Sequence, residues 1–400
     1  MSRRIFALII ILVAFMAGYV YWSIHRSLPN IKPTINNTLL KKISTTSNIT
    51  WPETGQSAIG VLGTNILLTN KAQDMEPTAS TAKMITALVV LDKKPLGLNQ
   101  TGPNITLTQN DVDIYNTYLA KQGSVVPVAV GENISEYQMI QAMLLPSANN
   151  MADSLALWAY GSLNAYSLAA NQYLKSQGII NTVVGDDASG FSPSTKSTAG
   201  DLVKIGELVM NSPVLASIVG QKNATGFPLT SSIKNVNYLL GENNIIGVKT
   251  GNTDQAGGVF VSASEIMISN KPVIIVTANL GSKTLVQSMN FSLPLIKSGQ
   301  ANVTSINIVT KNTVAGYYTL PWDKKKVEIK TRSSLDPIVW QGGNILPFES
   351  IRDLSVKDNQ NKVVGNISLK GSNIVDSKSV NLYLASKPTK PSLIWKILHP

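Results

Sequence analysis

The longest apolar segment of the chain runs from Ile5 to Trp22 and contains no charged residue. As an α-helix its eighteen residues would span about 27 Å, which matches the hydrocarbon core of a bilayer. Two arginines, Arg3 and Arg4, precede it, and basic residues favour the cytoplasmic side. The pattern predicts a cell-membrane anchor over residues 1–26, single-pass, with a cytoplasmic N-terminus and an extracytoplasmic remainder. Secretion after signal cleavage is the alternative, although no convincing small-residue cleavage site follows.

Residues 27–50 are rich in Asn, Thr, Ser, Pro and Lys, which predicts a linker. From Trp51 to about residue 300 the pattern is globular, with strand signals at both ends and helices between them. One antiparallel sheet with strands from both ends, packed against a helical block, accounts for this order and gives an α+β domain over 51–300. The predicted strands are Ser57–Leu62, Ile66–Thr69, Ile245–Thr250, Gly258–Ser264 and Pro272–Ala278.

Helical signals fill the middle of this domain. Met84–Leu91 is apolar on all sides, which predicts a buried helix. A capping box at Ser135 and Gln138 opens a helix that Pro146 ends. The remaining predicted helices are Asn150–Gln177, with a break near Gly161, and Gly200–Met210.

After residue 300 short β-type runs alternate with Gly, Asn, Asp and Pro, which predicts a small all-β domain over 301–400. The apolar tail Ser392–Leu398 is too short to span a membrane, and a membrane-surface segment, a frayed end and a last strand stay open. The predicted strands are Ser305–Val309, Lys326–Lys330, Val339–Gln341, Val363–Leu369 and Ser379–Leu384.

The composition of the chain indicates which partners to expect and excludes several kinds of catalytic and metal site. The 400 residues carry a formal net charge of +11, which favours an anionic partner such as a membrane surface, a cell-wall polymer or nucleic acid. Because the basic residues are scattered and the chain is expected outside the cytoplasm, we expect no nucleic acid. Cysteine is absent, which excludes a thiol nucleophile, disulfides and cysteine metal sites. The two histidines, His25 and His399, lie near the ends, so a Ser–His–Asp triad and a histidine-ligated metal are not expected.

Without histidine or cysteine, a serine nucleophile needs another base, and lysine is the candidate. Ser80 and Lys83 are three residues apart at the start of the predicted buried helix, so they share one helix face. Burial lowers a lysine pKa toward the range of a general base. Taken alone the pattern is weak, because Ser80 could be a helix cap and Ser231 with Lys234 has the same spacing.

Two further short motifs follow. Ser147 and Asn149 lie in a loop between helices, where a hydroxyl can relay a proton and an amide can hold a substrate. Lys249 and Thr250 end a predicted strand, where a cation and a hydroxyl can bind a carboxylate. Gly251, the next residue, lets a substrate backbone approach closely. Each motif also has an ordinary structural interpretation, as a helix stop and as an edge-strand turn.

Together and in this order, the three motifs match the S-x-x-K, S-x-N and K-T-G set of penicillin-binding proteins and serine β-lactamases. Residues 51–300 resemble the low-molecular-weight D-alanyl-D-alanine carboxypeptidases, serine peptidase family S11. The resemblance implies the penicillin-binding/serine β-lactamase-like transpeptidase fold with a small C-terminal all-β domain. It rests on the stretches Ala79–Leu88, Leu144–Asn150, Asp187–Ser192, Ser197–Leu202 and Gly247–Thr253.

By this resemblance, Ser80 is the acylated nucleophile and Lys83 its general base. Ser147 is a proton relay, and Asn149 is an amide clamp on the substrate. The implied reaction releases terminal D-alanine from peptidoglycan stem peptides through an acyl-enzyme. The implied partners are these stem peptides and β-lactam antibiotics, with membrane contact through the N-terminal helix. No metal or organic cofactor is implied.

The resemblance also assigns the substrate-binding residues. Lys249 and Thr250 hold the carboxylate of the terminal D-alanine, and Gly251 follows them. The backbone N–H groups of Ser80 and Asn252 form the oxyanion hole.

Two alternatives remain. A serine β-lactamase shares the acylation step, but the glutamate of the E-x-x-L-N motif is replaced by Pro95 or Tyr160 at the two Leu-Asn pairs. A non-catalytic cell-wall-binding scaffold on the same fold is the second alternative, and the intact set of motif residues argues against it.

Overall fold

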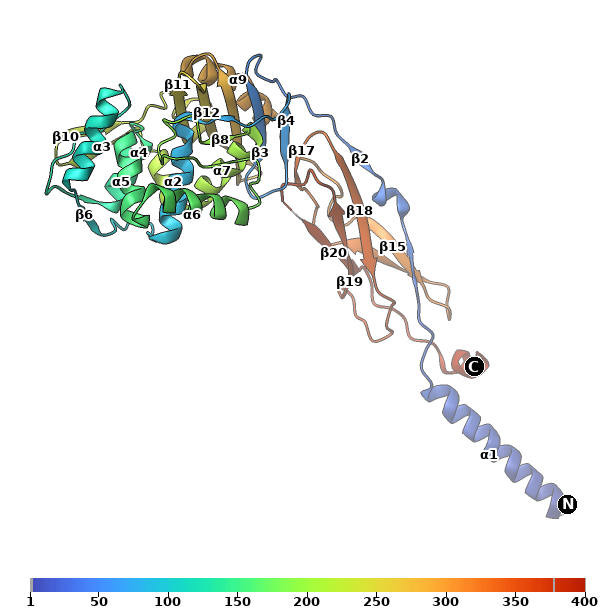
Figure 1. The fold of residues 1–400 in the computed structure, drawn as a ribbon. Coiled ribbons are helices and arrows are strands. Elements are labelled where there is room, and N and C mark those ends of the chain that lie inside the picture. Colours follow the sequence, from blue (N-terminus) through green and yellow to red (C-terminus); the bar gives the residue numbers. More distant parts are fainter. Residues whose placement is uncertain (1–2, 377, 400) are drawn as a thin grey trace. The chain divides into compact units, whose positions relative to one another are not determined.

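The computed structural model describes residues 3–376 and 378–399. Met1 and Ser2 of the predicted anchor, and Ser377 and Pro400 of the predicted C-terminal domain, lie outside the described residues. The chain forms two compact units (Figure 1). The larger unit comprises Ser47–Thr304, and the smaller unit combines Met1–Thr46 with Ser305–Pro400.

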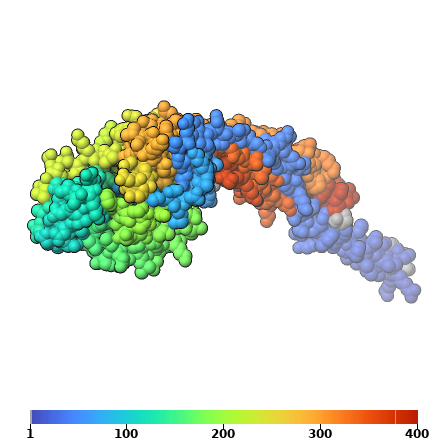
Figure 2. Space-filling model, turned by 45° about the horizontal axis from the view of Figure 1, so that its top comes forward, coloured from blue at the N-terminus to red at the C-terminus, as the bar shows by residue number. Residues whose placement is uncertain are grey.

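The larger unit is built on a five-stranded antiparallel sheet with the strand order β11-β12-β13-β3-β4. Its strands come from the two ends of the unit, as predicted, and β13 pairs with β3 across more than 200 residues of sequence. Figure 2 shows the early residues, in blue, directly beside the late ones, in gold. The strands are β3 (Gln56–Val61), β4 (Leu67–Asn70), β11 (Ile245–Thr253), β12 (Gly257–Ile268) and β13 (Lys271–Ser282).

Helices cover both faces of this sheet. A β-carbon at Gly206 of α7 would meet Val276, whereas one at Gly299 of α9 would meet Ile275. Because successive strand residues point to opposite faces, α7 and α9 lie on opposite sides of β13. The helices of this unit are α2 (Ala82–Lys93), α3 (Gln109–Ala120), α4 (Glu136–Leu144), α5 (Asn149–Tyr160), α6 (Leu163–Ser176), α7 (Ala199–Asn211), α8 (Pro213–Val219) and α9 (Leu285–Ala301), with 3-10 turns η2 (Ala79–Thr81) and η3 (Glu242–Asn244).

Three short two-stranded ribbons complete the larger unit. They pair β5 with β8, β6 with β7, and β9 with β10. The first joins the segment before Ser80 to the segment before α7. The short strands are β5 (Glu76–Pro77), β6 (Asn104–Thr106), β7 (Asn133–Ser135), β8 (Lys196–Ser197), β9 (Asn223–Phe227), β10 (Thr230–Lys234) and β14 (Val303–Ser305).

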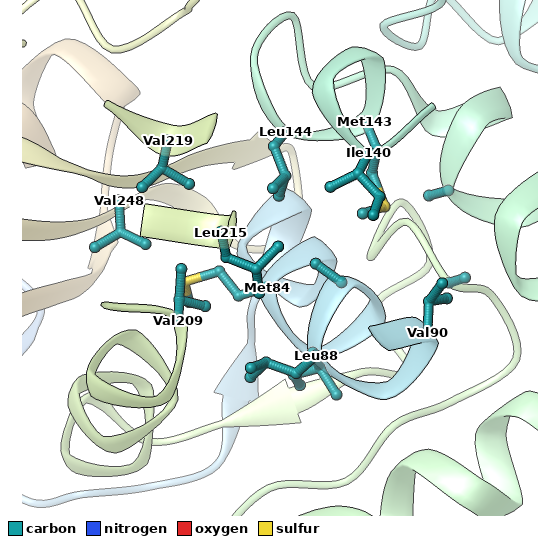
Figure 3. Close-up of a cluster of buried hydrophobic side chains, with 14 of the residues drawn as sticks. Met84, Leu88, Val90, Ile140, Met143, Leu144, Val209, Leu215, Val219 and Val248 are labelled. Atoms are coloured by element: carbon teal, nitrogen blue, oxygen red, sulfur yellow. The ribbon is translucent and has the colours of Figure 1, made fainter. Parts of the chain in front are cut away.

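Helix α2 runs through the core of this unit, and nine of its twelve residues are buried. In Figure 3 its side chains lie between those of α4 and those of α7, α8 and β11. A helix that is apolar all round can be stable only in such surroundings. The predicted buried helix is therefore confirmed, and it fixes the position of the residues at its N-terminus. The labelled side chains are Met84, Leu88, Val90, Ile140, Met143, Leu144, Val209, Leu215, Val219 and Val248.

The loop between α4 and α5 is defined by local signals that the sequence contains. Ser135 and Gln138 form the predicted capping box at the start of α4. The helix ends at Leu144, two residues before Pro146, because proline has no N–H to continue the helical hydrogen bonds and Ser147 after it has a φ of 66°. The next helix, α5, begins at Asn149, so Ser147 lies in the tight turn between them.

The smaller unit contains a seven-stranded sheet with the order β1-β15-β16-β20-β19-β18-β2. The α+β fold with an additional all-β region is confirmed, but β15 and β18 were not predicted, and the predicted run from Ser305 to Val309 ends as a strand at Ser305. The strands of this sheet are β1 (Pro33–Ile35), β2 (Ile43–Ser44), β15 (Val314–Thr319), β16 (Lys326–Thr331), β18 (Asn344–Ile351), β19 (Val363–Lys370) and β20 (Ser379–Leu384). Strand β17 (Ile338–Trp340) and the 3-10 turn η1 (Asn37–Leu40) lie outside the sheet.

The segment 27–50 differs from the predicted free linker. Its strands β1 and β2 pair with β15 and β18 and so occupy both edges of the seven-stranded sheet. An unpaired edge strand leaves backbone N–H and C=O groups without partners, and these short strands supply them. Polar composition alone did not reveal this, because edge strands carry little apolar pattern.

Helix α1 (Arg3–His25) is long and apolar enough to cross a membrane. None of its most apolar stretch is buried in the protein. The apolar tail forms a short helix, α10 (Leu393–Leu398), rather than a strand. Tyr19 of α1 donates a hydrogen bond to the carbonyl of Ile397 at 2.9 Å, so the two helices touch within this unit.

Candidate active site

Ser80 lies in the 3-10 turn η2, immediately before α2. Ala79, the residue before it, has a φ of 46°, a conformation that non-glycine residues adopt only where the surroundings require it. The turn is closed by Thr81, whose hydroxyl donates to the carbonyl of Thr78 at 2.7 Å. Ala79 and Thr81 are buried, whereas Ser80 is only partly buried. The turn therefore presents the Ser80 hydroxyl from a fixed, buried base.

Lys83 lies one turn further along α2, and its side chain is fully buried. Its Nζ donates to three acceptors: Oγ of Ser80 at 2.7 Å, Oδ1 of Asn149 at 2.7 Å and the carbonyl oxygen of Ser189 at 2.9 Å. These acceptors come from three separate segments of the chain. The lysine nitrogen is therefore held in one position, in contact with the Ser80 hydroxyl.

The carbonyl of Ser189 belongs to a tight turn that packs against Ala79. The Asp187 carboxylate accepts hydrogen bonds from the backbone N–H groups of Ser189, at 2.8 Å, and Gly190. Gly190 has a φ of 72°, and a β-carbon there would lie 2.1 Å from the carbonyl oxygen of Ala79. Only glycine fits this contact, so the turn is locked to the segment that carries Ser80.

Ser147 and Asn149 enter the site from the turn between α4 and α5. Ser147 has a φ of 66° and is 5% exposed. The backbone N–H of Asn149 donates to the carbonyl of Ser124 at 2.7 Å, and its side-chain oxygen accepts from Lys83. The hydroxyl of Ser147 accepts from Nζ of Lys249 at 3.0 Å. This turn therefore contacts both buried lysines.

Strand β11 supplies the third part of the site. Lys249 and Thr250 are buried, and Nζ of Lys249 also donates to the carbonyl of Thr250 at 3.0 Å. A β-carbon at Gly251 would lie 3.0 Å from the backbone nitrogen of Ser80. The glycine therefore lets the end of β11 lie directly against the turn that carries Ser80. Asn252, the next residue, is exposed.

Burial dominates the electrostatics of both lysines. It lowers the pKa of Lys83 from 10.5 to about 7, while the carboxylates of Asp187 and Asp153 act in the opposite direction. It also lowers the pKa of Lys249 well below its usual value, and the charge of Lys83 adds to that effect. Lys83 can therefore exchange a proton with Ser80 near neutral pH.

The structure brings the predicted residues into one site. Hydrogen bonds link Ser80, Lys83 and Asn149 on one side, and Ser147 and Lys249 on the other. Thr250, Gly251 and Asn252 continue the strand beside Ser80. In the described part of the chain, no group of three His, Asp or Glu side chains is arranged to hold a metal ion.

The sequence reasoning missed two contributors. The carbonyl of Ser189 contacts Lys83, although only the resemblance of its stretch to a known family had drawn attention to it. Asp153 lies one helical turn after Asn149, and a lone carboxylate among apolar residues of a buried helix was the signal that could have found it.

The comparisons with known proteins agree with this geometry. Residues 56–282 match the family model of the S11 peptidases, described as D-alanyl-D-alanine carboxypeptidase. A D-alanyl-D-alanine endopeptidase of Escherichia coli K12 is 32% identical over 248 residues, which cover 59% of this chain and 74% of the relative. The D-alanyl-D-alanine carboxypeptidase DacA of the same organism is 30% identical over 208 residues, which cover half of each chain.

Solved structures show the same fold. The DD-transpeptidase of Streptomyces K15 matches with a TM-score of 0.55 and 24% identity, covering 65% of this chain and 99% of its own. Penicillin binding protein 5 of Haemophilus influenzae matches with a TM-score of 0.58 and 18% identity, covering 86% of this chain and 99% of its own. The family model covers more than half of the chain and includes all three motifs. The chain therefore belongs to the S11 peptidase family and is a serine-type D-alanyl-D-alanine carboxypeptidase.

Proposed function

We propose that Ser80 is the acylated nucleophile of this enzyme and Lys83 its general base. The observation that carries the proposal is the 2.7 Å contact between Nζ of the fully buried Lys83 and Oγ of Ser80. A neutral lysine keeps two N–H donors and one lone pair. With Asn149 and Ser189 taking the two donors, the lone pair faces the Ser80 hydroxyl and can accept its proton.

Lys249 and Thr250 then bind the carboxylate of the terminal D-alanine. A buried lysine with a lowered pKa becomes cationic when an anion arrives, because an opposite charge favours the ammonium form. Gly251 leaves space for the peptide backbone along β11. The backbone N–H groups of Ser80 and Asn252 stabilise the oxyanion of the tetrahedral intermediate.

The proton that Lys83 took from Ser80 passes through Ser147, which is hydrogen-bonded to Lys249, to the nitrogen of the departing D-alanine, so Lys83 is neutral again. Asn149 holds the substrate amide while its side-chain oxygen orients Lys83. Water then attacks the carbonyl of the Ser80 ester while Lys83 takes its proton, and Lys83 returns that proton to Oγ of Ser80 as the ester bond breaks. The products are D-alanine and a stem peptide shortened by one residue.

The substrate class is the peptidoglycan stem peptide ending in D-alanyl-D-alanine, and β-lactam antibiotics acylate the same serine. Residues 51–300 form the catalytic domain and 301–400 the β domain, in which residues 27–46 also take part. Helix α1 is a single-pass anchor of the cell membrane, with a cytoplasmic N-terminus and an extracytoplasmic catalytic domain. The support is its length, its apolar surface and the two arginines at its N-terminus.

Endopeptidase action is a second candidate activity. The E. coli relative that is 32% identical carries the name D-alanyl-D-alanine endopeptidase. Both activities use the same acyl-enzyme and differ in the departing amine, which is free D-alanine in the carboxypeptidase reaction and an amine of a second stem peptide in the endopeptidase reaction. A binding site with free space beyond Lys249 would accept either departing group.

The test uses the full-length chain in detergent micelles. A synthetic peptide ending in D-alanyl-D-alanine should release free D-alanine, and penicillin should add one molecule per chain in the intact mass. A persistent adduct supports a peptidase, and an adduct that disappears as penicillin is consumed indicates a β-lactamase. No adduct and no D-alanine would refute the proposal. Conversion of a cross-linked dimeric peptide into its monomeric peptides would establish the endopeptidase activity.

A further inference from the structure

Asp153 is a buried carboxylate that the mechanism above does not use. It lies in α5, one turn after Asn149, and is 5% exposed. Burying a carboxylate is costly unless hydrogen bonds or opposite charges compensate for the lost water. The residues that contact Asp153 therefore indicate its function.

Both carboxylate oxygens of Asp153 have partners. The hydroxyl of Tyr118, on α3, donates to Oδ2 at 2.6 Å, and the backbone N–H of Ala188 donates to Oδ1 at 2.9 Å. The Tyr118 hydroxyl also lies 3.3 Å from Oγ of Ser189. One carboxylate thus joins α3, α5 and the turn that contains Ser189.

This turn contacts Lys83 directly. Ala188 immediately precedes Ser189, whose carbonyl accepts from Lys83. The carbonyl of Ala188 accepts from the hydroxyl of Thr86, one turn after Lys83 on α2. Ala188 is therefore fixed at its N–H by Asp153 and at its carbonyl by α2, and the Ser189 carbonyl cannot move away from the lysine.

We propose that Asp153, held by Tyr118, is a positioning residue for Lys83: it fixes the Ser189 carbonyl against the lysine nitrogen and keeps a negative charge behind it. The proposal rests on the proposed role of Lys83 as general base. Among the described residues, the hydrogen bonds of Asp153 and Tyr118 lead to the turn that holds Lys83 and not to Ser80, so we assign both an action through Lys83.

The charges around Lys83 come from several elements. Burial lowers the pKa of Lys83, and Asp187 in the turn and Asp153 on α5 oppose this effect. The charge of Lys83 in turn lowers the pKa of Lys249 on β11. Tyr118 packs against Asp153 from α3, and its hydrogen bond lowers the pKa of that carboxyl. Burial still raises the pKa of Asp153 to about 6, so the group is a carboxylate at pH 7 and above.

The test measures the rate of acylation by a fluorescent penicillin from pH 5 to 9, using the full-length chain. The variants are Asp153→Asn and Tyr118→Phe, with Asp113→Asn as the control. Asp113 is an exposed carboxylate on α3 that accepts from Gln109 on the same helix, and it is not among the carboxylates that raise the pKa of Lys83. Helices α3 and α5 stay linked in every variant through the hydrogen bond from Ser154 to Asp111.

In the wild type we expect the rate to rise with pH through the pKa of Lys83, near 7. Loss of the charge in Asp153→Asn lowers that pKa. The acidic limb, which is the rise of the acylation rate with pH, should therefore have its midpoint about half a pH unit lower. Tyr118→Phe raises the pKa of Asp153, so part of the carboxylate is protonated and the limb moves in the same direction by less. Asp113→Asn leaves the limb in place.

A purely structural role predicts a different result. The rate would then fall by the same factor at every pH, with the midpoint of the limb unchanged in both variants, and this would overturn the proposal. Should Asp153→Asn fail to fold in a thermal melt, Tyr118→Phe alone decides, because it keeps the aromatic ring. A wild-type chain that takes up no penicillin would refute the proposed function itself. This outcome differs from variants that are labelled by penicillin and whose rates rise with pH at the same midpoint as the wild type.

Discussion

Two lysine–serine pairs meet in the active site, and they differ in what surrounds them. Lys83 contacts Ser80 at 2.7 Å, and Lys249 contacts Ser147 at 3.0 Å. Both lysines are buried, and burial lowers the pKa of both. Residue type and burial alone would therefore assign the same role to each pair.

The carboxylates distinguish them. Asp187 and Asp153 lie near Lys83 and keep its pKa at about 7. For Lys249, the described residues supply only the charge of Lys83, which lowers its pKa further. A base needs a pKa near the working pH, whereas a carboxylate receptor needs to become cationic when the substrate binds. The comparison shows that nearby charges, and not the motif residues themselves, determine that Lys83 acts as the base and Lys249 as the receptor of the substrate carboxylate.

The largest effect should separate the two serines. Ser80→Ala removes the hydroxyl that the turn before α2 presents to Lys83, so we expect complete loss of the covalent penicillin adduct in the intact mass. Ser147→Ala removes a proton relay, so acylation should slow about 10²- to 10³-fold while the adduct still forms. An adduct on Ser80→Ala would mean that Ser147 is the nucleophile and would reverse the comparison.

The next effect concerns the base. Lys83→Ala leaves Ser80 without an acceptor for its proton, so the rate of acylation should fall about 10²- to 10⁴-fold. It should also lose its dependence on the pKa near 7. Stopped-flow labelling across pH measures both quantities. A rate close to that of the wild type, with the limb retained, would identify Lys249 as the base.

The receptor lysine should behave differently. Lys249→Gln keeps a donor toward Ser147 but removes the charge, and a hydrogen bond to a charged group contributes about 1.5–3 kcal/mol. We therefore expect substrate binding to weaken about 10- to 100-fold, seen as a higher KM for the D-alanyl-D-alanine peptide. The midpoint of the acidic limb should stay near 7. A large fall in kcat at unchanged KM would contradict the role as receptor.

The sequence was sufficient for the residues whose position depends on local structure. Ser80 and Lys83 share a helix face because of their spacing, and burial of that helix followed from its apolar surface. The competing pair, Ser231 and Lys234, lies in strand β10, where residues three apart point to opposite faces and both side chains are exposed. The local sequence pattern could not exclude Ser231 and Lys234, because a short polar strand has too little hydrophobic alternation to be recognised.

Residues that act through long-range contacts were out of reach. Tyr118 and Asp153 are 35 residues apart, and nothing in the spacing places a hydroxyl of α3 against a carboxylate of α5. The same holds for β1 and β2, which pair with strands about 300 residues later. In these cases tertiary packing decides the contact, and the pattern of one short segment has no information about its partner.

The smallest effect tests how the two lysine–serine pairs are held together. Gly251 lies where β11 meets the turn of Ser80, and a β-carbon there would be 3.0 Å from the backbone nitrogen of Ser80 and 3.1 Å from the carbonyl of Thr78. In Gly251→Ala the turn must shift by a few tenths of an ångström. We expect acylation to slow about tenfold, because the shifted N–H is a donor of the oxyanion hole.

The matched control is Gly200→Ala in helix α7, where a β-carbon would meet side chains of other residues only at 3.4 Å and beyond. It should leave the rate unchanged and keep or raise the melting temperature, because alanine favours a helix over glycine. Acylation rates and thermal melts of both variants decide the point. If Gly251→Ala acylates as fast as the wild type, the strand carrying Lys249 does not set the position of Ser80, and the two pairs are aligned by the Ser147–Asn149 turn alone.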